Sequence, residues 1–423
     1  MIKAIHRAKY VLAGPDDLQL NAAVCVADSG RISQVQPWQC QPSDPKVPVV
    51  DWGSAVIMPG LINAHTHLEL TSLHNQLTQF SSFTNWIFQL ISRRYSWTSE
   101  DFLASTKEGA RLSLSSGTTL VGDITASGSG WEAANENLRR VVFEETIALS
   151  SSQADQALSQ LNESLEKIGR NPLLKHGVSP HAPYSVSPEL FQRTAQLARD
   201  KRMLLATHAA ETRAELEFLQ EGTGEFREFL EAAGVLPDDW APPKLPPILY
   251  LDSLGVLGKS CLLIHCNYLD QKSISRISAA RSSVVYCPRS HAFFGHEQHP
   301  IRQLLDSGVN VALGTDSLAS NNSLSMLDEM RFLYKNHKDI KIAEIFRAAT
   351  LGGATALDFD GTLGLLKPGY HADMTVLQLP ESLKAGQLIG QVLEGAGECI
   401  GTVVEGQTAW QKPGIMESRI LVL

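Results

Sequence analysis

The amino-acid sequence predicts an α/β protein: a (β/α)8 TIM barrel with a small β-sandwich-like domain formed by both ends of the chain. Short apolar runs recur from residue 57 onward, and segments with helical spacing separate most of them. The two ends of the chain contain short strand-like runs and turns instead. A chain of 423 residues is long enough for a barrel with an added domain.

Eight apolar runs predict the eight strands of the barrel. In chain order they are VIMPGLINAH, TTLVGD, RRVVFEETIA, LKHGVSPHA, MLLATHAAE, CLLIHCN, SSVVYCP and NVALGTDS. Segments such as DFLASTKEGARLSLSSG, PELFQRTAQLARDKR and MLDEMRFLYKNHK lie between them with the spacing of amphipathic helices. This alternation favours a parallel sheet, and eight units point to a closed barrel.

The same pattern sets the expected domain boundaries. The barrel is expected over residues 57–361, and residues 1–56 and 362–423 are assigned jointly to one small β-domain. Five prolines in GVLPDDWAPPKLPPILYLDSLG mark a surface excursion, residues 236–250, between the fifth and sixth strands. On a barrel such an excursion could cover a site.

Composition restricts the partners that we expect. The 43% hydrophobic and 19% charged residues are typical of a folded globular chain, and a net charge of −9 argues against nucleic acid. The sequence shows neither a signal peptide nor an apolar run of about 20 residues, so we expect a cytoplasmic location without a membrane partner. The cysteines form no CxxC pair, which favours free thiols: Cys25, Cys40, Cys261, Cys266, Cys287 and Cys399.

Five residues of metal-ligand type stand at the ends of predicted strands. His65 and His67 are two positions apart, so both side chains should face the barrel interior. His208, His265 and Asp316 end three further runs, and barrel active sites lie at this end. Each alone could be a hydrogen-bonded core histidine or a helix-capping aspartate. Together they favour a divalent metal ion, Zn²⁺ or alternatively Fe²⁺, which would lower the pKa of a water molecule.

The motifs, taken in order, resemble the amidohydrolase superfamily, and within it the cytosine-deaminase-like (ATZ/TRZ) aminohydrolases. They are PGLINAHTH, HAAE, HC, GTDSLASNNSLSMLDEMR and GYHADMTVL, and they span nearly the whole chain. The resemblance implies a single metal ion held by His65, His67, His208 and Asp316, with His265 beside the metal's water. Relatives with two metals commonly bridge them through a lysine at the end of the fourth strand. Here that position lies in SPHAPYS, and Lys175 stands at the start of the run.

The resemblance also implies catalytic roles. Glu211 in HAAE would carry protons to a heterocycle and its leaving amine, Asp316 would take a proton from water, and His265 would orient that water. The implied function is release of ammonia from an amino-substituted N-heterocycle, such as a purine nucleoside. A helix N-terminal carboxylate is the structural alternative for Glu211. The functional alternatives are hydrolysis of another C–N or C–Cl bond, as in cyclic amides or chlorotriazines, and a metal-free scaffold.

Several residues are candidate contacts for a small heterocyclic substrate. His181 lies in PHAPY, where related deaminases have a base-contacting histidine, and Trp86 follows the first strand. Relatives acting on methylthioadenosine or adenosylhomocysteine usually have a ribose-binding glutamate just before this tryptophan, whereas this chain has Thr84 and Asn85. Glu69 could also face the site, although an exposed or ion-paired carboxylate is the expected state.

The segment CPRSHAFFGH departs from the pattern of many relatives, which read SN after the CP pair. Arg289, His291, Phe293 and Phe294 could form a cationic, aromatic-walled pocket for a carboxylate or phosphate, or simply a structural loop. Together with HTHLEL, the segment resembles the group that includes aminofutalosine deaminases, whose substrate is an adenine nucleoside bearing a benzoate. A homodimer is a further expectation.

Overall fold

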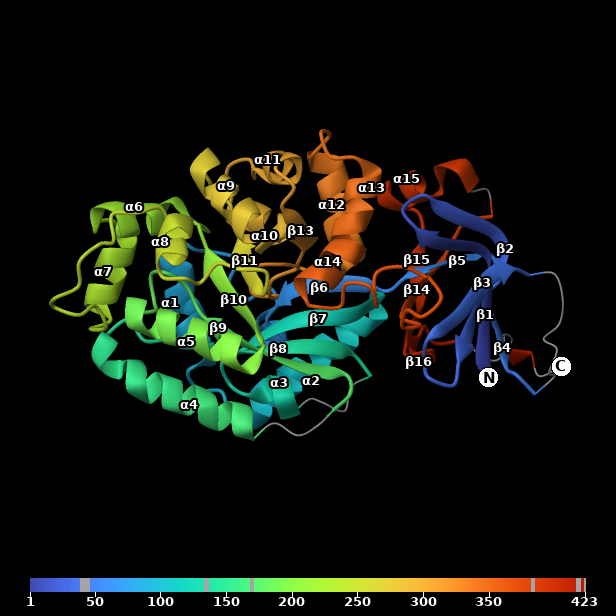
Figure 1. Ribbon diagram of the computed structural model, residues 1–423, viewed down its shortest axis with the longest axis horizontal. Coiled ribbons are helices and arrows are strands. Elements are labelled where there is room, and N and C mark those ends of the chain that lie inside the picture. The colour runs from blue at the N-terminus through green and yellow to red at the C-terminus, as the bar shows by residue number, and fades with distance from the viewer. Residues whose placement is uncertain (39–45, 133–136, 168–170, 382–384, 416–419, 422–423) are drawn as a thin grey trace.

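Eight parallel strands, β6 to β13, form a barrel with helices around it (Figure 1). The computed structural model describes residues 1–38, 46–132, 137–167, 171–381, 385–415 and 420–421. The barrel strands are β6 (Leu61–Thr66), β7 (Thr118–Thr125), β8 (Arg139–Thr146), β9 (Leu174–Pro180), β10 (Leu204–Ala209), β11 (Cys261–His265), β12 (Ser283–Tyr286) and β13 (Asn310–Leu313). They pair in chain order, and all eight predicted runs contain one of them. The predicted barrel is confirmed.

The barrel closes between its last and first strands. The backbone N–H groups of Thr315 and Asp316 both donate to the carbonyl of His65, each at 3.1 Å. Alternate strand residues fill the interior: Ile62, Ala64, Leu120, Ile124, Val141, Phe143, Leu204, Ala206, Leu262, Ile264, Val285 and Ala312. Because the other face of these strands packs against the helices, the strands are apolar on both sides, as in other parallel sheets.

Helices surround the barrel and cap its ends. They are α1 (Phe83–Arg94), α2 (Ser99–Ser115), α3 (Ser129–Glu132), α4 (Ala154–Glu166), α5 (Pro188–Lys201), α6 (Arg213–Glu221), α7 (Glu225–Ala232), α8 (Pro247–Ser253), α9 (Gln271–Ala280), α10 (Pro288–Phe293), α11 (Ile301–Asp306), α12 (Met326–Asn336), α13 (Ile342–Arg347), α14 (Gly353–Ala356) and α15 (Leu388–Leu393). Shorter helical turns cover Leu68–Leu73, Ser151–Gln153, Ala348–Gly352 and Ala385–Gln387. Local sequence explains several starts: the hydroxyls of Ser82, Thr98 and Ser187 accept N-terminal N–H groups of α1, α2 and α5.

Both ends of the chain meet in one nine-stranded sheet beside the barrel (Figure 1). Its strands are β1 (Ile2–Gly14), β2 (Asp17–Ala27), β3 (Ile32–Pro37), β4 (Val49–Asp51), β5 (Ala55–Pro59), β14 (Met374–Gln378), β15 (Glu398–Val404), β16 (Gln407–Gln411) and β17 (Ile420–Leu421). The sheet branches at β1, which pairs with β4 near its start and with β5 farther along. Its core contains the fully buried Trp52.

The boundary between the two domains differs from the one expected between residues 56 and 57. The apolar run VIMPGLINAH contains two strands, because β5 pairs with β1 and β14 whereas β6 pairs with β7. The chain crosses from one sheet to the other at Gly60, where a Cβ atom would overlap the side chain of Thr119. Apolar character alone does not mark this break, since both strands are buried.

The described cysteines are all buried and free. They are Cys25, Cys261, Cys266, Cys287 and Cys399, and Cys40 lies outside the described residues. Among the helices of the described ranges, none is long and apolar enough to span a membrane.

A buried ion-pair cluster joins the barrel to the small domain. Arg139, at the start of β8, donates to both carboxylate oxygens of Asp373 (3.1 and 3.2 Å) and to Glu405 (2.6 Å). His371 Nδ1 lies 2.8 Å from the same Glu405 carboxylate. Burial alone would raise the pKa of Glu405, but His371 and Arg139 lower it from 4.5 to about 2.

Replacing Arg139 with Met is expected to lower the free energy of unfolding by about 3–5 kcal/mol, because it leaves the buried Asp373 without its cation. The wild-type contribution of Glu405 is present above about pH 4.5 and is lost as the pH falls from there to about 2. Urea unfolding between pH 3 and pH 7 measures both effects. Arg111→Met, which removes an exposed ion pair with Glu108, is the control and should change little. Equal effects of the two substitutions would contradict the prediction.

Candidate active site

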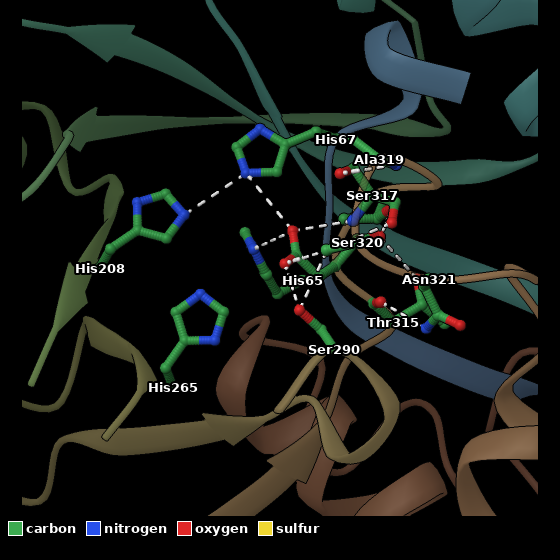
Figure 2. Close-up of polar contacts among 12 residues, drawn as sticks. His65, His67, His208, His265, Ser290, Thr315, Ser317, Ala319, Ser320 and Asn321 are labelled. Carbon is green, nitrogen blue, oxygen red and sulfur yellow. Dashed lines mark hydrogen bonds and ion pairs between the residues drawn. The ribbon is translucent and has the colours of Figure 1, made fainter. Parts of the chain in front are cut away.

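Four histidines converge at the carboxyl ends of the barrel strands (Figure 2). The His67 and His208 Nε2 atoms lie 3.4 Å apart, and the His65 ring centroid lies 4.9 Å from that of His67 and 5.1 Å from that of His208. One nitrogen of each of these three rings lies within 4.8 Å of the others. The His265 ring lies 5.5 Å from that of His208. The four histidines come from three separate stretches of the chain, and Asp316, whose Oδ1 lies 3.6 Å from His65 Nε2, adds a fourth.

The first strand reaches this geometry through an irregularity. Ile62 and Ala64 face the barrel interior, so strict alternation would turn His65 outward. The pairing of β6 with β7 shifts register between Asn63 and Thr66. Such a bulge changes which side of the strand a residue faces, and His65 joins the interior cluster.

Two site residues have unusual backbone conformations. His265 has φ of 71° and Asp316 has φ of 57°, the left-handed region that residues with a Cβ seldom adopt. His265 ends β11, and Asp316 lies three residues beyond the end of β13, where the chain turns away from the sheet. The conformation aims both side chains back over the barrel mouth, and such strain is common at functional sites.

Hydroxyl groups hold the Asp316 carboxylate in place. Its Oδ2 accepts hydrogen bonds from Ser290 (2.7 Å) and Ser320 (2.8 Å), and its Oδ1 accepts one from the Ser317 backbone N–H. Oδ1 faces the histidines, at 3.6 Å from His65 Nε2 and 4.0 Å from His67 Nε2. These separations are too long for direct hydrogen bonds, so the carboxylate and the two rings leave room for a common partner.

The protonation pattern of the cluster fits a metal ion. His208 Nδ1 donates to the carbonyl of His181 at 3.1 Å, which leaves Nε2 as a lone-pair donor toward His67. Both ring nitrogens of His65 are buried without a hydrogen-bond partner among the described residues. An unpaired buried nitrogen is costly, and a cation bound between the three rings and Asp316 would satisfy it. This donor set of imidazole and carboxylate suits a single divalent ion.

Lys175 lies far from this cluster. It stands near the start of β9, and its Nζ donates to the Asp358 carbonyl at 2.6 Å. It therefore does not bridge ions at the carboxyl end of the barrel, which agrees with one metal position.

Glu211 lies beside the cluster with its carboxylate 3.3 Å from His265 Nε2. It does not cap the following helix, because the Thr212 hydroxyl does so by accepting the Glu215 N–H. The Glu215 carboxylate in turn accepts the backbone N–H of Ala210 and of Glu211, which fixes the turn. Burial, with Asp316 and Glu215 nearby, raises the pKa of Glu211 well above 4.5. A carboxyl group with a raised pKa can both accept and release a proton near neutral pH.

A cavity of about 290 Å³ opens above the histidines. Its described lining residues are His67, Glu69, Leu70, Phe83, Trp86, Ile87, Leu90, Ile91, Arg94, Glu145, Ile147, His181, Tyr184, Ser185, His208, Glu211, Phe229, Leu230, Ala233, Val235, His265, Asp316 and Ser317. The wall is mostly apolar and the base is polar, which is the usual character of a small-molecule site. Trp86 and His181, two candidate substrate contacts, are among the lining residues.

Glu69 also lines the cavity, but it is neither exposed nor ion-paired as expected. It is 2% exposed, and its carboxylate accepts hydrogen bonds from Thr125 Oγ1 (2.7 Å) and from the backbone N–H groups of Ala126 and Ser127. The helical turn that begins at Leu68 bends the chain over β7, so Glu69 anchors a loop. These contacts leave its oxygens little capacity to bind a substrate.

No residue of the segment CPRSHAFFGH lines the cavity above the histidines, and Arg289 and Phe293 instead line a separate cavity with Ser320 and Asn321. Arg289 donates to the Ser323 hydroxyl at 3.0 Å and lies near Glu329. His291 packs among other rings, and Phe294 packs against Trp86 with ring centroids 5.0 Å apart. The tight turn into α10 directs these side chains behind the cavity wall.

The segment just before the proline-rich excursion, rather than the excursion itself, lines the cavity. Phe229, Leu230 and Ala233 at the end of α7, with Val235, cover one side of the cavity, whereas the five prolines do not line it. Trp240 stacks on Phe218 with ring centroids 4.2 Å apart, which holds the excursion against α6.

Several polar residues of the lining were not identified from the sequence, among them Arg94, Glu145, Tyr184 and Ser185. Glu145 had a usable signal, because Val141 and Phe143 face the barrel interior and a residue two positions later should do the same. Burial, with Glu69 nearby, raises the pKa of Glu145 to about 8. Arg94 and Tyr184 gave no such signal, and Ser185 reaches the site by binding His181 Nδ1 at 2.6 Å.

A parallel eight-stranded barrel with histidines and a carboxylate converging at its carboxyl end defines a metal-dependent barrel hydrolase. The sequence matches the family described as "Amidohydrolase family" over residues 56–409. The chain belongs to the amidohydrolase family, as its motifs predicted.

Relatives and solved structures agree with this class. The chain is 31% identical over 377 residues to a 5-methylthioadenosine/S-adenosylhomocysteine deaminase from Syntrophobacter fumaroxidans, covering 86% of this chain and 81% of the relative. It is 29% identical over 346 residues to an aminodeoxyfutalosine deaminase from Nitratiruptor, covering 78% and 80%. A zinc-bound adenosine deaminase structure from Xanthomonas campestris superimposes with a TM-score of 0.79 at 25% identity, covering 96% and 92%.

Proposed function

We propose that this protein is a metal-dependent deaminase. Its substrate is an amino-substituted N-heterocycle, the base of a purine nucleoside, from which it releases ammonia. The observation that carries the proposal is Glu211, a buried carboxyl group with a raised pKa beside the histidine cluster and facing the cavity. Loss of an amine requires protonation of the leaving group, which this carboxyl group can supply. The deaminases among the relatives support the same chemistry.

His65, His67, His208 and Asp316 are the residues that would hold the ion, with Zn²⁺ as the first candidate. When bound, the ion would act as a Lewis acid and would lower the pKa of a coordinated water molecule to about 7. The net reaction forms a C–O bond to a ring carbon, breaks its exocyclic C–N bond and releases ammonia.

The chain's own residues move the protons. Asp316 Oδ1 faces the histidines and would accept a proton from the attacking water, since Ser290 and Ser320 hold Oδ2. Glu211 would deliver protons to the ring nitrogen and then to the departing amine. Burial lowers the pKa of His265 to about 3, so its ring is neutral and can orient the water and the Glu211 carboxyl group.

Two further residues would position the heterocycle. Ser185 donates to the Ala182 carbonyl, so it accepts from His181 Nδ1 and leaves His181 Nε2 as an acceptor toward the cavity. Trp86 offers an indole face in the apolar wall, fixed by a 3.4 Å hydrogen bond to the Ala319 carbonyl. Stacking and one ring-edge hydrogen bond are sufficient to orient a planar base.

Ammonia release tests the proposal. Zinc-loaded protein is expected to deaminate at least one aminopurine nucleoside in a panel that also contains free purines, pyrimidines, pterins and aminotriazines. The panel should include adenosine, 5′-methylthioadenosine, S-adenosylhomocysteine and aminodeoxyfutalosine. If only a free base or a triazine is turned over, the substrate is not a nucleoside. If no compound releases ammonia although the protein holds one equivalent of metal, the protein is not a deaminase.

A further inference from the structure

Two buried side chains hold the backbone of Glu211 and His265 from behind the active site. Asn267 Nδ2 donates to the Glu211 carbonyl at 3.0 Å, and His299 Nε2 donates to the His265 carbonyl at 2.9 Å. Asn267 is 4% exposed and His299 is 2% exposed. The two carbonyls belong to the pair of residues whose side chains meet at 3.3 Å beside the histidine cluster. Each member of this pair therefore has its own backbone support.

The direction of the His299 hydrogen bond follows from the chemistry of its partner. A carbonyl oxygen only accepts, so Nε2 carries the proton, and burial lowers the pKa of His299 well below 6.5, so the ring is neutral. The ring stacks on Tyr286 with centroids 3.7 Å apart. It belongs to the connection between α10 and α11, three residues beyond CPRSHAFFGH. Packing thus holds the ring where its N–H group reaches the last carbonyl of β11.

The two turns that receive this support have unusual backbones. His265 and Cys266 are in the left-handed region in succession, with φ of 71° and 53°, and Ala210, just before Glu211, has φ of 52°. Residues with a Cβ seldom adopt this region, and such conformations persist only where surrounding contacts hold them. The two turns are also joined directly, since the Tyr268 N–H donates to the Ala210 carbonyl at 3.1 Å. A change in one turn therefore reaches the other.

Neither Asn267 nor His299 lines the cavity above the histidines, whereas Glu211 and His265 do. Both instead line a different cavity, together with Tyr268. A substrate bound above the histidines therefore meets the side chains of the Glu211–His265 pair but not the two residues behind it. Asn267 and His299 can act on the reacting centre only through the backbone that they hold.

We propose that His299 and Asn267 are positioning residues for proton transfer. Through the two carbonyls they keep the carboxyl group and the imidazole of the pair at their 3.3 Å separation beside the reacting centre. This inference rests on the proposed deaminase function and names two residues on which its geometry depends. Displacement of a reacting group by about 1 Å is enough to cost about 10²-fold in rate. The metal ion should stay bound, because these two hydrogen bonds do not involve a proposed ligand.

His299→Phe keeps a ring on Tyr286 but removes the N–H group. We expect kcat to fall about 10- to 100-fold and KM to change less than about threefold, in protein that keeps its metal and is folded at the assay temperature. His299→Gln can place an amide N–H near the position of Nε2 and should recover at least about fivefold of this loss. His337→Phe is the matched control, because the His337 side chain bonds Tyr286 rather than a residue of the site.

Asn267→Leu keeps the volume of the side chain but removes its donor to the Glu211 carbonyl, and we expect the same pattern of kcat, KM and metal content. The matched control is Asn310→Leu. Asn310 Nδ2 likewise donates to a backbone carbonyl, that of Gly352 at 3.0 Å, but it lies at the start of β13, at the opposite end of the barrel. This arm is independent of His299 and carries the test if His299→Phe fails to fold.

A double-mutant cycle separates positioning from a general loss of structure. In a Glu211→Gln background the proton transfer is already lost, so His299→Phe and Asn267→Leu should each cost less than about threefold further in kcat. A structural defect would instead lower kcat by the same factor in both backgrounds. An unchanged factor, or a loss no larger than that of the matched control, would overturn the inference.

Failure of this inference and failure of the proposed function are distinguishable. If wild-type protein deaminates a nucleoside and both variants keep near-normal kcat, the positioning role is wrong and deamination stands. If both variants lose the metal ion or the fold together with turnover, the two residues are structural and the inference is overturned. If wild-type protein deaminates no nucleoside, the proposed function fails and this inference fails with it.

Discussion

Glu211→Gln is expected to lower kcat by about 10²- to 10⁴-fold while the protein keeps its metal ion. Glutamine preserves the size of the side chain and its contact with His265, but it cannot take up and release a proton. The effect should fall on kcat more than on KM, because proton transfer occurs in the transition state. The raised pKa of Glu211 supports this role, since a carboxyl group of ordinary pKa would hold no proton near neutral pH.

Steady-state kinetics on the substrate found by the ammonia assay, with metal content measured on the same samples, checks this prediction. Glu221→Gln is the matched control, because Glu221 is an exposed carboxylate at the end of the following helix α6. A Glu211→Gln variant with near-normal turnover would remove Glu211 from proton transfer. Loss of metal together with turnover would instead assign it a structural role at the cluster.

His208→Ala is expected to release the metal ion and to abolish turnover. The His208 ring is held by the His181 carbonyl and presents Nε2 to His67, so its removal takes one nitrogen donor from the proposed ligand set. Loss of a partner outside the ligand shell costs about 10- to 100-fold in metal affinity, and loss of a ligand should cost more. The remaining rings, His65 above all, would then be buried without a partner.

Metal analysis after gel filtration and the ammonia assay measure the two effects. His176→Gln is the control, because His176 lies on β9 outside the cluster and stacks on Trp131. Zinc bound at one equivalent by His208→Ala, with turnover retained, would place the metal elsewhere. Zinc retained with turnover lost would make His208 a catalytic group rather than a ligand.

The predicted fold class and family are confirmed, and the reason lies in local pattern. Strands buried on both faces require continuous apolar runs, and the sequence contains eight such runs in the barrel region. The candidate ligands end such runs, and parallel strands bring their carboxyl ends to one edge. His65, His67, His208, His265 and Asp316 therefore meet although up to 251 residues separate them in the chain.

The substrate contacts were less predictable. Arg289 and His291 follow a barrel strand closely, yet a helical turn carries them behind the wall. Arg94 stands 27 residues after His67 and reaches the cavity only because α1 packs over the barrel mouth. Nearness to a motif in sequence does not determine the direction of a side chain outside regular strands.

Sequence alone was sufficient for the barrel, the shared small domain and the family, because each depends on periodicity and residue type. Only the tertiary structure decided which polar groups are already bonded and which are free. The Glu69 carboxylate is hydrogen-bonded to Thr125 and Ser127. Glu145 and Arg94 instead line the cavity without a hydrogen bond or ion pair to any described residue. Satisfaction of a buried charge depends on atoms brought from distant parts of the chain, which the local pattern of the sequence does not reveal.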